Sequence, residues 1–130
     1  MTERIDQELE LLRSVFPNLE YSREGHWVRL PQYRMPSDCG WHTTEVAVAF
    51  QFPAAYPGQK PYGFHVSPVP VLANGGTVQN ATGSAEPPWA GPWLKFSWDV
   101  PEWMPAEEVR LGSNILDFTL TFVERLRQGA

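Results

Sequence analysis

Thr44-Glu45-Val46-Ala47-Val48-Ala49-Phe50-Gln51-Phe52 is the stretch that decides the fold, because its side chains alternate with a period of two. In an extended chain one face carries Val46, Val48, Phe50 and Phe52, and the other carries Glu45, Ala47, Ala49 and Gln51. We expect the first face to lie in the core and the second to lie away from it. The stretch is therefore predicted to be the central strand of a β-sheet.

Shorter extended segments surround this strand. They cover residues 26–35, residues 62–66 and residues 93–98, the last of which is either a strand or an extended crossing. Pro31 interrupts the first segment and indicates an edge strand or a bulge, since proline cannot donate to a ladder. Residues 36–40 are predicted to form a turn, and residues 67–92 a long irregular loop.

Helical patterns occupy both ends of the chain. Residues 2–16 have apolar residues at helical spacing from Ile5 to Phe16, and Pro17 ends the pattern. A second helical stretch is expected to begin near Pro105, to be weakened at Gly112 and to continue with an apolar stripe to Leu126. The order of elements predicts an α+β fold, an antiparallel meander with an N-terminal and a C-terminal helix packed on one face.

Composition limits the possible functions. A chain of 130 residues is expected to form a single domain, residues 1–130. The net charge is −5 and the only lysines are Lys60 and Lys95, so we expect no nucleic-acid partner. The single cysteine, Cys39, excludes an internal disulfide. Without an apolar span or a signal-peptide pattern, we expect a cytoplasmic protein that does not enter a membrane.

Several motifs resemble the ubiquitin-conjugating (E2, or UBC) superfamily. A strand ending in Phe52-Pro53 is followed by Tyr56-Pro57 and then Pro61, and Trp103-Met104-Pro105 precedes a helix. Residues 8–17 also resemble the first helix of RWD domains, which are non-catalytic relatives of E2 enzymes. Within the superfamily, the chain resembles the bacterial E2-like group called prokaryotic E2 family E. The resemblance implies an E2/UBC-RWD-like fold in which Tyr56, Pro57, Pro61, Trp103 and Pro105 are fold-motif residues.

The catalytic residue of an E2 has no counterpart in this sequence. An E2 needs a cysteine shortly before its Trp-x-Pro element, because a thiolate must accept the ubiquitin C-terminus. The resemblance places that former active-site region at Leu94, Lys95 and Phe96. We therefore expect a pseudoenzyme, with no catalytic residue. Its expected partners are a ubiquitin-like protein, an E1-like protein or an active E2 in a bacterial ubiquitin-like conjugation pathway.

Other candidate residues and functions remain open. Trp89, Trp93, Trp98 and Trp103 are expected to form one aromatic cluster, and possible binding residues are His65, Trp89, Trp93 and Trp98. Asp99 and Glu102 could form an acid–base pair, although an acidic surface loop is favoured. The histidines and Cys39 lack metal-ligand spacing, so neither a metal nor a cofactor is expected. Alternative functions are an active E2-like enzyme with a non-canonical site, for example at Cys39, and a structural RWD-like interaction module.

Overall fold

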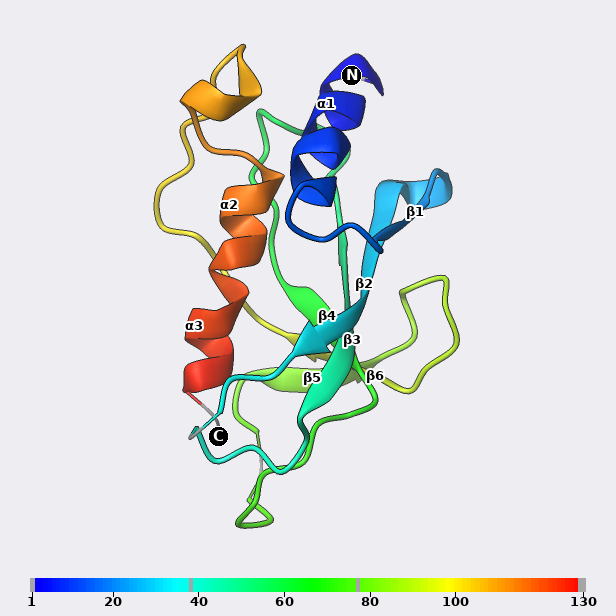
Figure 1. The fold of residues 1–130 in the computed structure, drawn as a ribbon, viewed down its shortest axis with the longest axis vertical. Helices are drawn as coiled ribbons and strands as arrows, with labels where there is room; N and C mark the ends of the chain where they lie inside the picture. Colours follow the sequence, from blue (N-terminus) through cyan, green and yellow to red (C-terminus); the bar gives the residue numbers. More distant parts are fainter. Residues whose placement is uncertain (1, 38, 77, 129–130) are drawn as a thin grey trace.

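A six-stranded antiparallel sheet with helices at both ends of the chain makes up the fold (Figure 1). The computed structural model describes residues 2–37, 39–76 and 78–128. In chain order the elements are α1 (Thr2–Arg13), β1 (Glu20–Ser22), the 3₁₀ turn η1 (Glu24–His26), β2 (Trp27–Arg34), β3 (Glu45–Gln51), β4 (Phe64–Ser67), β5 (Ala81–Ser84), β6 (Trp93–Phe96), the 3₁₀ turn η2 (Val109–Leu111), α2 (Ile115–Leu120) and α3 (Phe122–Arg127). This architecture confirms the predicted α+β class.

The strand order is β1-β2-β3-β4-β6-β5, and every neighbouring pair is antiparallel. The register of β2 on β3 shifts between Leu30 and Tyr33, on either side of Pro31, so the predicted bulge is confirmed. β1 pairs with β2 only from Trp27 to Arg29, so at Pro31 the side of β2 away from β3 is not paired with β1, as the alternative of an edge position requires. The sequence patterns also did not predict β1, or β5 within the loop of residues 67–92.

Helices α1, α2 and α3 cover one face of the sheet. Side chains of β3, including Val46, Val48 and Phe50, share a single core cluster with apolar residues of all three helices. Phe50 meets the edges of Phe118 and Phe122, with ring centroids 6.3 and 5.5 Å apart. Edge-to-face contacts of this kind add to the burial of each ring. The predicted core face of the central strand is thus confirmed.

The expectation that the opposite face of β3 lies away from the core is only partly right. Glu45 and Gln51 are exposed as predicted, but Ala47 and Ala49 are buried. They pack in a second cluster with Trp27 of β2 and Trp93 of β6. The large indole rings from β2 and β6 pack with the small alanine side chains, an effect that alternation within one strand cannot reveal.

The helix boundaries differ from the predicted ones at both ends. Helix α1 stops at Arg13, before the predicted limit of residue 16. Pro105 is outside any helix, and the C-terminal helical region begins at Asn114, whose side chain accepts a 2.9 Å hydrogen bond from Asp117 N–H. The predicted break at Gly112 is confirmed. A Cβ there would lie 2.5 Å from Ala106 N and Met104 O, so glycine permits a close backbone approach.

Candidate functional site

The Tyr-Pro loop and the Trp103 segment, which carry the family resemblance, lie against each other. Tyr56 is fully buried, and its ring contacts Phe52 and Trp103 at centroid distances of 4.9 and 5.8 Å. The Trp103 indole Nε1 donates a 2.8 Å hydrogen bond to the Pro57 carbonyl oxygen. Pro61, which follows Pro57 in the same loop, is also buried. Four of the five predicted fold-motif residues are therefore packed in or against the domain, whereas Pro105 is exposed.

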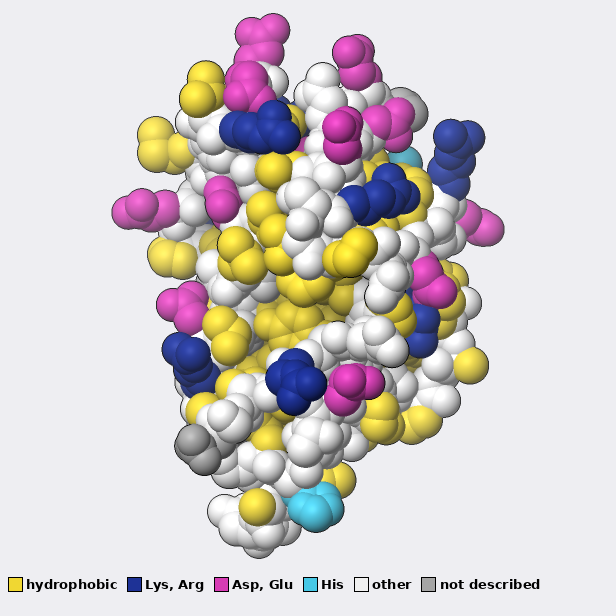
Figure 2. Space-filling model, in the orientation of Figure 1, with side chains coloured by type: hydrophobic (Ala, Val, Ile, Leu, Met, Phe, Trp, Pro, Cys, Tyr) yellow, Lys and Arg dark blue, Asp and Glu magenta, His cyan; other side chains and the backbone are white. Residues whose placement is uncertain are grey.

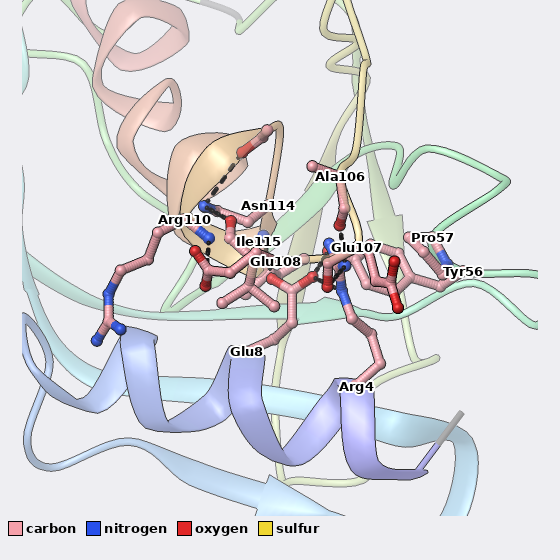
Figure 3. Close-up of polar contacts among 12 residues, drawn as sticks. Arg4, Glu8, Tyr56, Pro57, Ala106, Glu107, Glu108, Arg110, Asn114 and Ile115 are labelled. Carbon is pink, nitrogen blue, oxygen red and sulfur yellow. Dashed lines mark hydrogen bonds and ion pairs between the residues drawn. The ribbon is translucent and has the colours of Figure 1, made fainter.

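A buried carboxylate connects this junction to two helices (Figure 3). Glu8 of α1 is 0% exposed, and its Oε2 accepts hydrogen bonds from Tyr56 Oη at 2.5 Å and Arg4 Nε at 2.9 Å. Its Oε1 accepts from the backbone N–H of Ile115, the first residue of α2, at 2.8 Å. Arg4 also donates to the carbonyl oxygen of Ala106. The charge is tolerated in the core because three donors satisfy it, one of which is the cationic side chain of Arg4.

The sequence analysis assigned no role to Glu8. One signal was available: Glu8 lies three residues after Ile5 and four before Leu12, on the apolar face of the helix. A charged residue on such a face needs a buried partner. Those partners come from residues 56 and 115, so the pattern within α1 alone could not identify them.

Tyr56 is held as a neutral hydrogen-bond donor. Burial raises the pKa of its phenol, and the hydrogen bond to Glu8 and the negative charge of Glu8 raise the pKa further. A phenol that keeps its proton donates to the carboxylate throughout the physiological pH range. The arrangement stabilises the junction of α1, the Tyr-Pro loop and α2, and it provides no exposed nucleophile.

The predicted former active-site region lies inside the sheet. Leu94, Lys95 and Phe96 belong to β6, which pairs with β4 on one side and β5 on the other. Phe96 is buried in the core and stacks on Phe64 with a centroid distance of 5.1 Å. Lys95 contacts Glu86 on the opposite face, with 3.5 Å between Nζ and Oε1. This segment therefore contributes packing and an ion pair.

His65 of β4 lies on the face of the sheet away from the helices. It is 5% exposed, and its ring meets the edge of Trp27 at a centroid distance of 5.3 Å. Neither ring nitrogen has a hydrogen-bond partner among the described residues, and Nε2 is 3.9 Å from Glu86 Oε1. Burial lowers the pKa of His65, while the charge of Glu86 acts in the opposite direction. The imidazole is consequently favoured in its neutral form.

The four predicted tryptophans do not form one cluster. Trp93 donates a 2.9 Å hydrogen bond to the carbonyl oxygen of Trp89, and both pack on the outer face with Trp27. Trp98 donates to Thr121 Oγ1 at 2.9 Å, and Trp98 and Trp103 pack against the main core. The expectation of a single cluster is wrong because β6 and the segment after it direct these rings to different faces. Their predicted role in binding, together with that of His65, stays a prediction.

The remaining candidates occupy exposed loops. Asp99 forms an ion pair with Lys60, with 2.8 Å between Oδ1 and Nζ, and Lys60 also donates to the Val100 carbonyl oxygen at 3.0 Å. Glu102 is exposed. The thiol of Cys39, in the connection between β2 and β3, donates to the Ser37 carbonyl oxygen at 3.3 Å. Asp99 thus has a cationic partner, as expected of a surface carboxylate.

The surface carries acidic and apolar regions that the sequence analysis did not single out. Acidic side chains gather at the top of Figure 2. Shallow hollows between α1 and the η2 segment are lined by the acidic residues Glu3, Glu10, Glu107 and Glu108 and also by Arg4 and Arg110. Large apolar side chains also remain exposed, including Met104 (76%), Leu111 (79%) and Leu120 (52%). Such side chains are candidate contacts for a protein partner.

Comparison of the chain with protein-family models, with curated proteins and with solved structures gives no significant match in any of the three. Within residues 2–37, 39–76 and 78–128, no helix has the length and apolar character needed to cross a membrane.

Proposed function

We propose that this chain is a non-catalytic protein of the E2/UBC-RWD type that binds a ubiquitin-like protein, an E1-like protein or an active E2 in a bacterial ubiquitin-like conjugation pathway. One combined observation carries the proposal. The two sequence motifs that resemble the family are in contact, and the segment that would hold the catalytic cysteine contains none. Tyr56, Pro57 and Trp103 are joined by ring contacts and by the bond from Trp103 Nε1 to the Pro57 carbonyl oxygen. The corresponding active-site segment contains Leu94, Lys95 and Phe96.

Two further features support binding over conjugation. A thioester requires a reachable thiol, and the only cysteine is held in the connection between β2 and β3, whereas the former active-site region is on β6. Exposed apolar side chains at Leu111 and Leu120 offer contact area that the fold itself does not use.

The test is direct binding. The purified chain is mixed in turn with a bacterial ubiquitin-like protein, an E1-like protein and an active E2, and complexes are measured by size exclusion and calorimetry. At least one stable complex is expected. The absence of a complex with all of these proteins would refute the proposal.

Three exposed positions can then locate the binding face. Leu111→Glu, Leu120→Glu and Tyr62→Glu alter side chains that are 79%, 52% and 58% exposed, so each variant should keep its melting temperature. One of them should weaken binding about tenfold or more if its side chain lies in the interface. The other two then serve as matched controls.

An active E2-like enzyme is the first alternative. In this case Cys39 would have to form a reducible adduct with a ubiquitin-like protein in the presence of E1 and ATP, and Cys39→Ala would abolish the adduct. The second alternative is a structural RWD-like module that dimerises. Light scattering over a range of concentrations separates a dimer from a monomeric binding protein.

A further inference from the structure

We propose that His65, Glu86 and the loop of residues 85–92 form a proton-controlled latch on the outer face of the sheet. Neutral His65 allows this loop, here called the strap, to close over the sheet, and protonated His65 releases it. The proposal is independent of the partner proposed above, because it rests on contacts within the chain.

The strap leaves β5, passes over the outer face and returns to β6. In Figure 1 it extends from β5 and β6 on the side of the sheet away from α2 and α3. Trp89 packs on the outer cluster, and Pro87 is buried. The face beneath includes Ala49, Trp93 and His65, all buried. Closing the strap therefore contributes to keeping water from the imidazole.

Few polar contacts fix the strap. Among the described residues, no backbone–backbone hydrogen bond involves residues 85–92. Trp93 Nε1 donates to the Trp89 carbonyl oxygen at 2.9 Å, and Glu86 N–H donates to Ser84 Oγ at 3.2 Å. The Glu86 carboxylate accepts from Ser84 Oγ at 3.5 Å, forms an ion pair with Lys95 at 3.5 Å and lies 3.9 Å from His65 Nε2. A segment held by so few bonds can open without unfolding the sheet.

Protonation of His65 favours the open strap over the closed one. Two charged groups act on the imidazole, Glu86 from the strap and Lys95 from β6, and they have opposite signs. From β2 the Trp27 ring is neutral, and from β3 the Ala49 backbone acts in the same direction as Glu86, raising the pKa of His65 by less than burial lowers it. Glu86 is 3.9 Å away and already shared with Lys95, so it compensates the imidazolium only in part. An imidazolium is better solvated when the strap is open.

The direction of the switch follows. In the open form His65 should titrate near its ordinary pKa of about 6.5. In the closed form burial lowers that pKa, so the open form binds protons more readily. The ratio of open to closed strap therefore rises as pH falls below about 6.5, by about tenfold for each unit of difference between the two pKa values.

The experiment is fluorine NMR of the full chain labelled with 5-fluorotryptophan, titrated from pH 8 to pH 5. Signals are assigned with Trp89→Phe and Trp98→Phe. The Trp89 signal should move to the position of a solvent-exposed indole with falling pH, while the Trp98 signal, from the helix-covered side, stays unchanged. In His65→Asn the Trp89 signal should not depend on pH.

Glu86→Gln tests the latch without altering the buried face. Because it removes both the counter-charge of the imidazolium and the ion pair with Lys95, the Trp89 transition should move to higher pH. The latch is refuted by a Trp89 signal that is constant from pH 8 to pH 5, or by a transition that persists in His65→Asn. Parallel movement of the Trp98 signal would equally refute it, since global unfolding would then be the cause.

Discussion

The hydroxyl of Tyr56 donates a 2.5 Å hydrogen bond to Glu8 Oε2, which joins the Tyr-Pro loop to α1 across 48 residues of sequence. Both side chains are 0% exposed. A carboxylate in such a place depends on every donor around it, since water cannot replace a lost one.

Removing only the hydroxyl of Tyr56 should weaken the fold. Tyr56→Phe keeps the ring contacts with Phe52 and Trp103 but leaves Glu8 with one donor fewer, so we expect a loss of about 1–3 kcal/mol in the free energy of unfolding. Urea denaturation measures the change. Tyr62→Phe is the matched control, because Tyr62 is largely exposed. Equal stabilities of the two variants would contradict the prediction.

Replacing the buried carboxylate should cost more. Glu8→Ala deprives Arg4 and the Ile115 N–H of their shared acceptor, and breaking a buried ion pair in this way costs about 3–5 kcal/mol. Glu10→Ala, on an exposed part of the same helix, should change stability by less than about 0.5 kcal/mol. Thermal and urea unfolding of both variants check the comparison, and a similar small effect at Glu8 would argue against a structural role.

Alkaline pH should destabilise the chain through Tyr56. Its pKa is raised in the folded state, so above the unfolded value of about 10 the unfolded chain releases this proton more readily. The stabilising contribution is complete below about pH 10 and is lost as pH rises further, with a limiting slope of about 1.4 kcal/mol per pH unit. Unfolding free energies measured from pH 9 to pH 11 should fall less steeply in Tyr56→Phe than in the parent chain. Identical slopes would show that Tyr56 ionises normally.

A charge in the centre of β3 should prevent folding. Val48 is 0% exposed in the main core, and Val48→Asp would bury an unpaired carboxylate at a cost of more than about 4 kcal/mol. Circular dichroism and solubility provide the measurement. Thr44→Asp, on an exposed residue just before the strand, should retain the native spectrum.

Adding a thiol to β6 should not create a conjugating enzyme. Lys95→Cys places sulfur in a strand that is paired on both sides. The resemblance to E2 enzymes puts the motif with the oxyanion-stabilising asparagine at Pro68-Val69-Pro70, which contains no asparagine. The loss of such a donor alone lowers the rate by about two to three orders of magnitude in a known hydrolase. A thioester assay with E1, ATP and a ubiquitin-like protein should remain at background. Discharge of the protein at ordinary E2 rates would require the non-catalytic proposal to be withdrawn.

The sequence patterns predicted those features that depend on residues adjacent in the chain. The alternation of Val46, Val48 and Phe50 identified β3, and Gly112 marked the break before the last helices. The bulge at Pro31 followed from its missing N–H. Each of these features depends on a few adjacent residues, so a single sequence contains enough information to predict it.

Features that depend on distant partners were missed. Ala47 and Ala49 are buried because Trp27 and Trp93 of other strands pack with them. β5 forms a strand because it pairs with β6. Glu8 is a satisfied charge only through Tyr56 and Ile115. Such contacts are fixed by the tertiary fold, so strand or helix periodicity does not report them.

The contact between Glu8 and the Ile115 N–H also bears on how the protein is made. A ribosome releases α1 first, whereas the last partner of Glu8 lies 107 residues later in the chain. Until that residue has left the exit tunnel, the glutamate cannot be buried without an unmet acceptor, so the nascent helix has to remain hydrated. We expect α1 to dock only after α2 has left the ribosome, because an earlier intermediate that buries Glu8 would lack the Ile115 N–H donor.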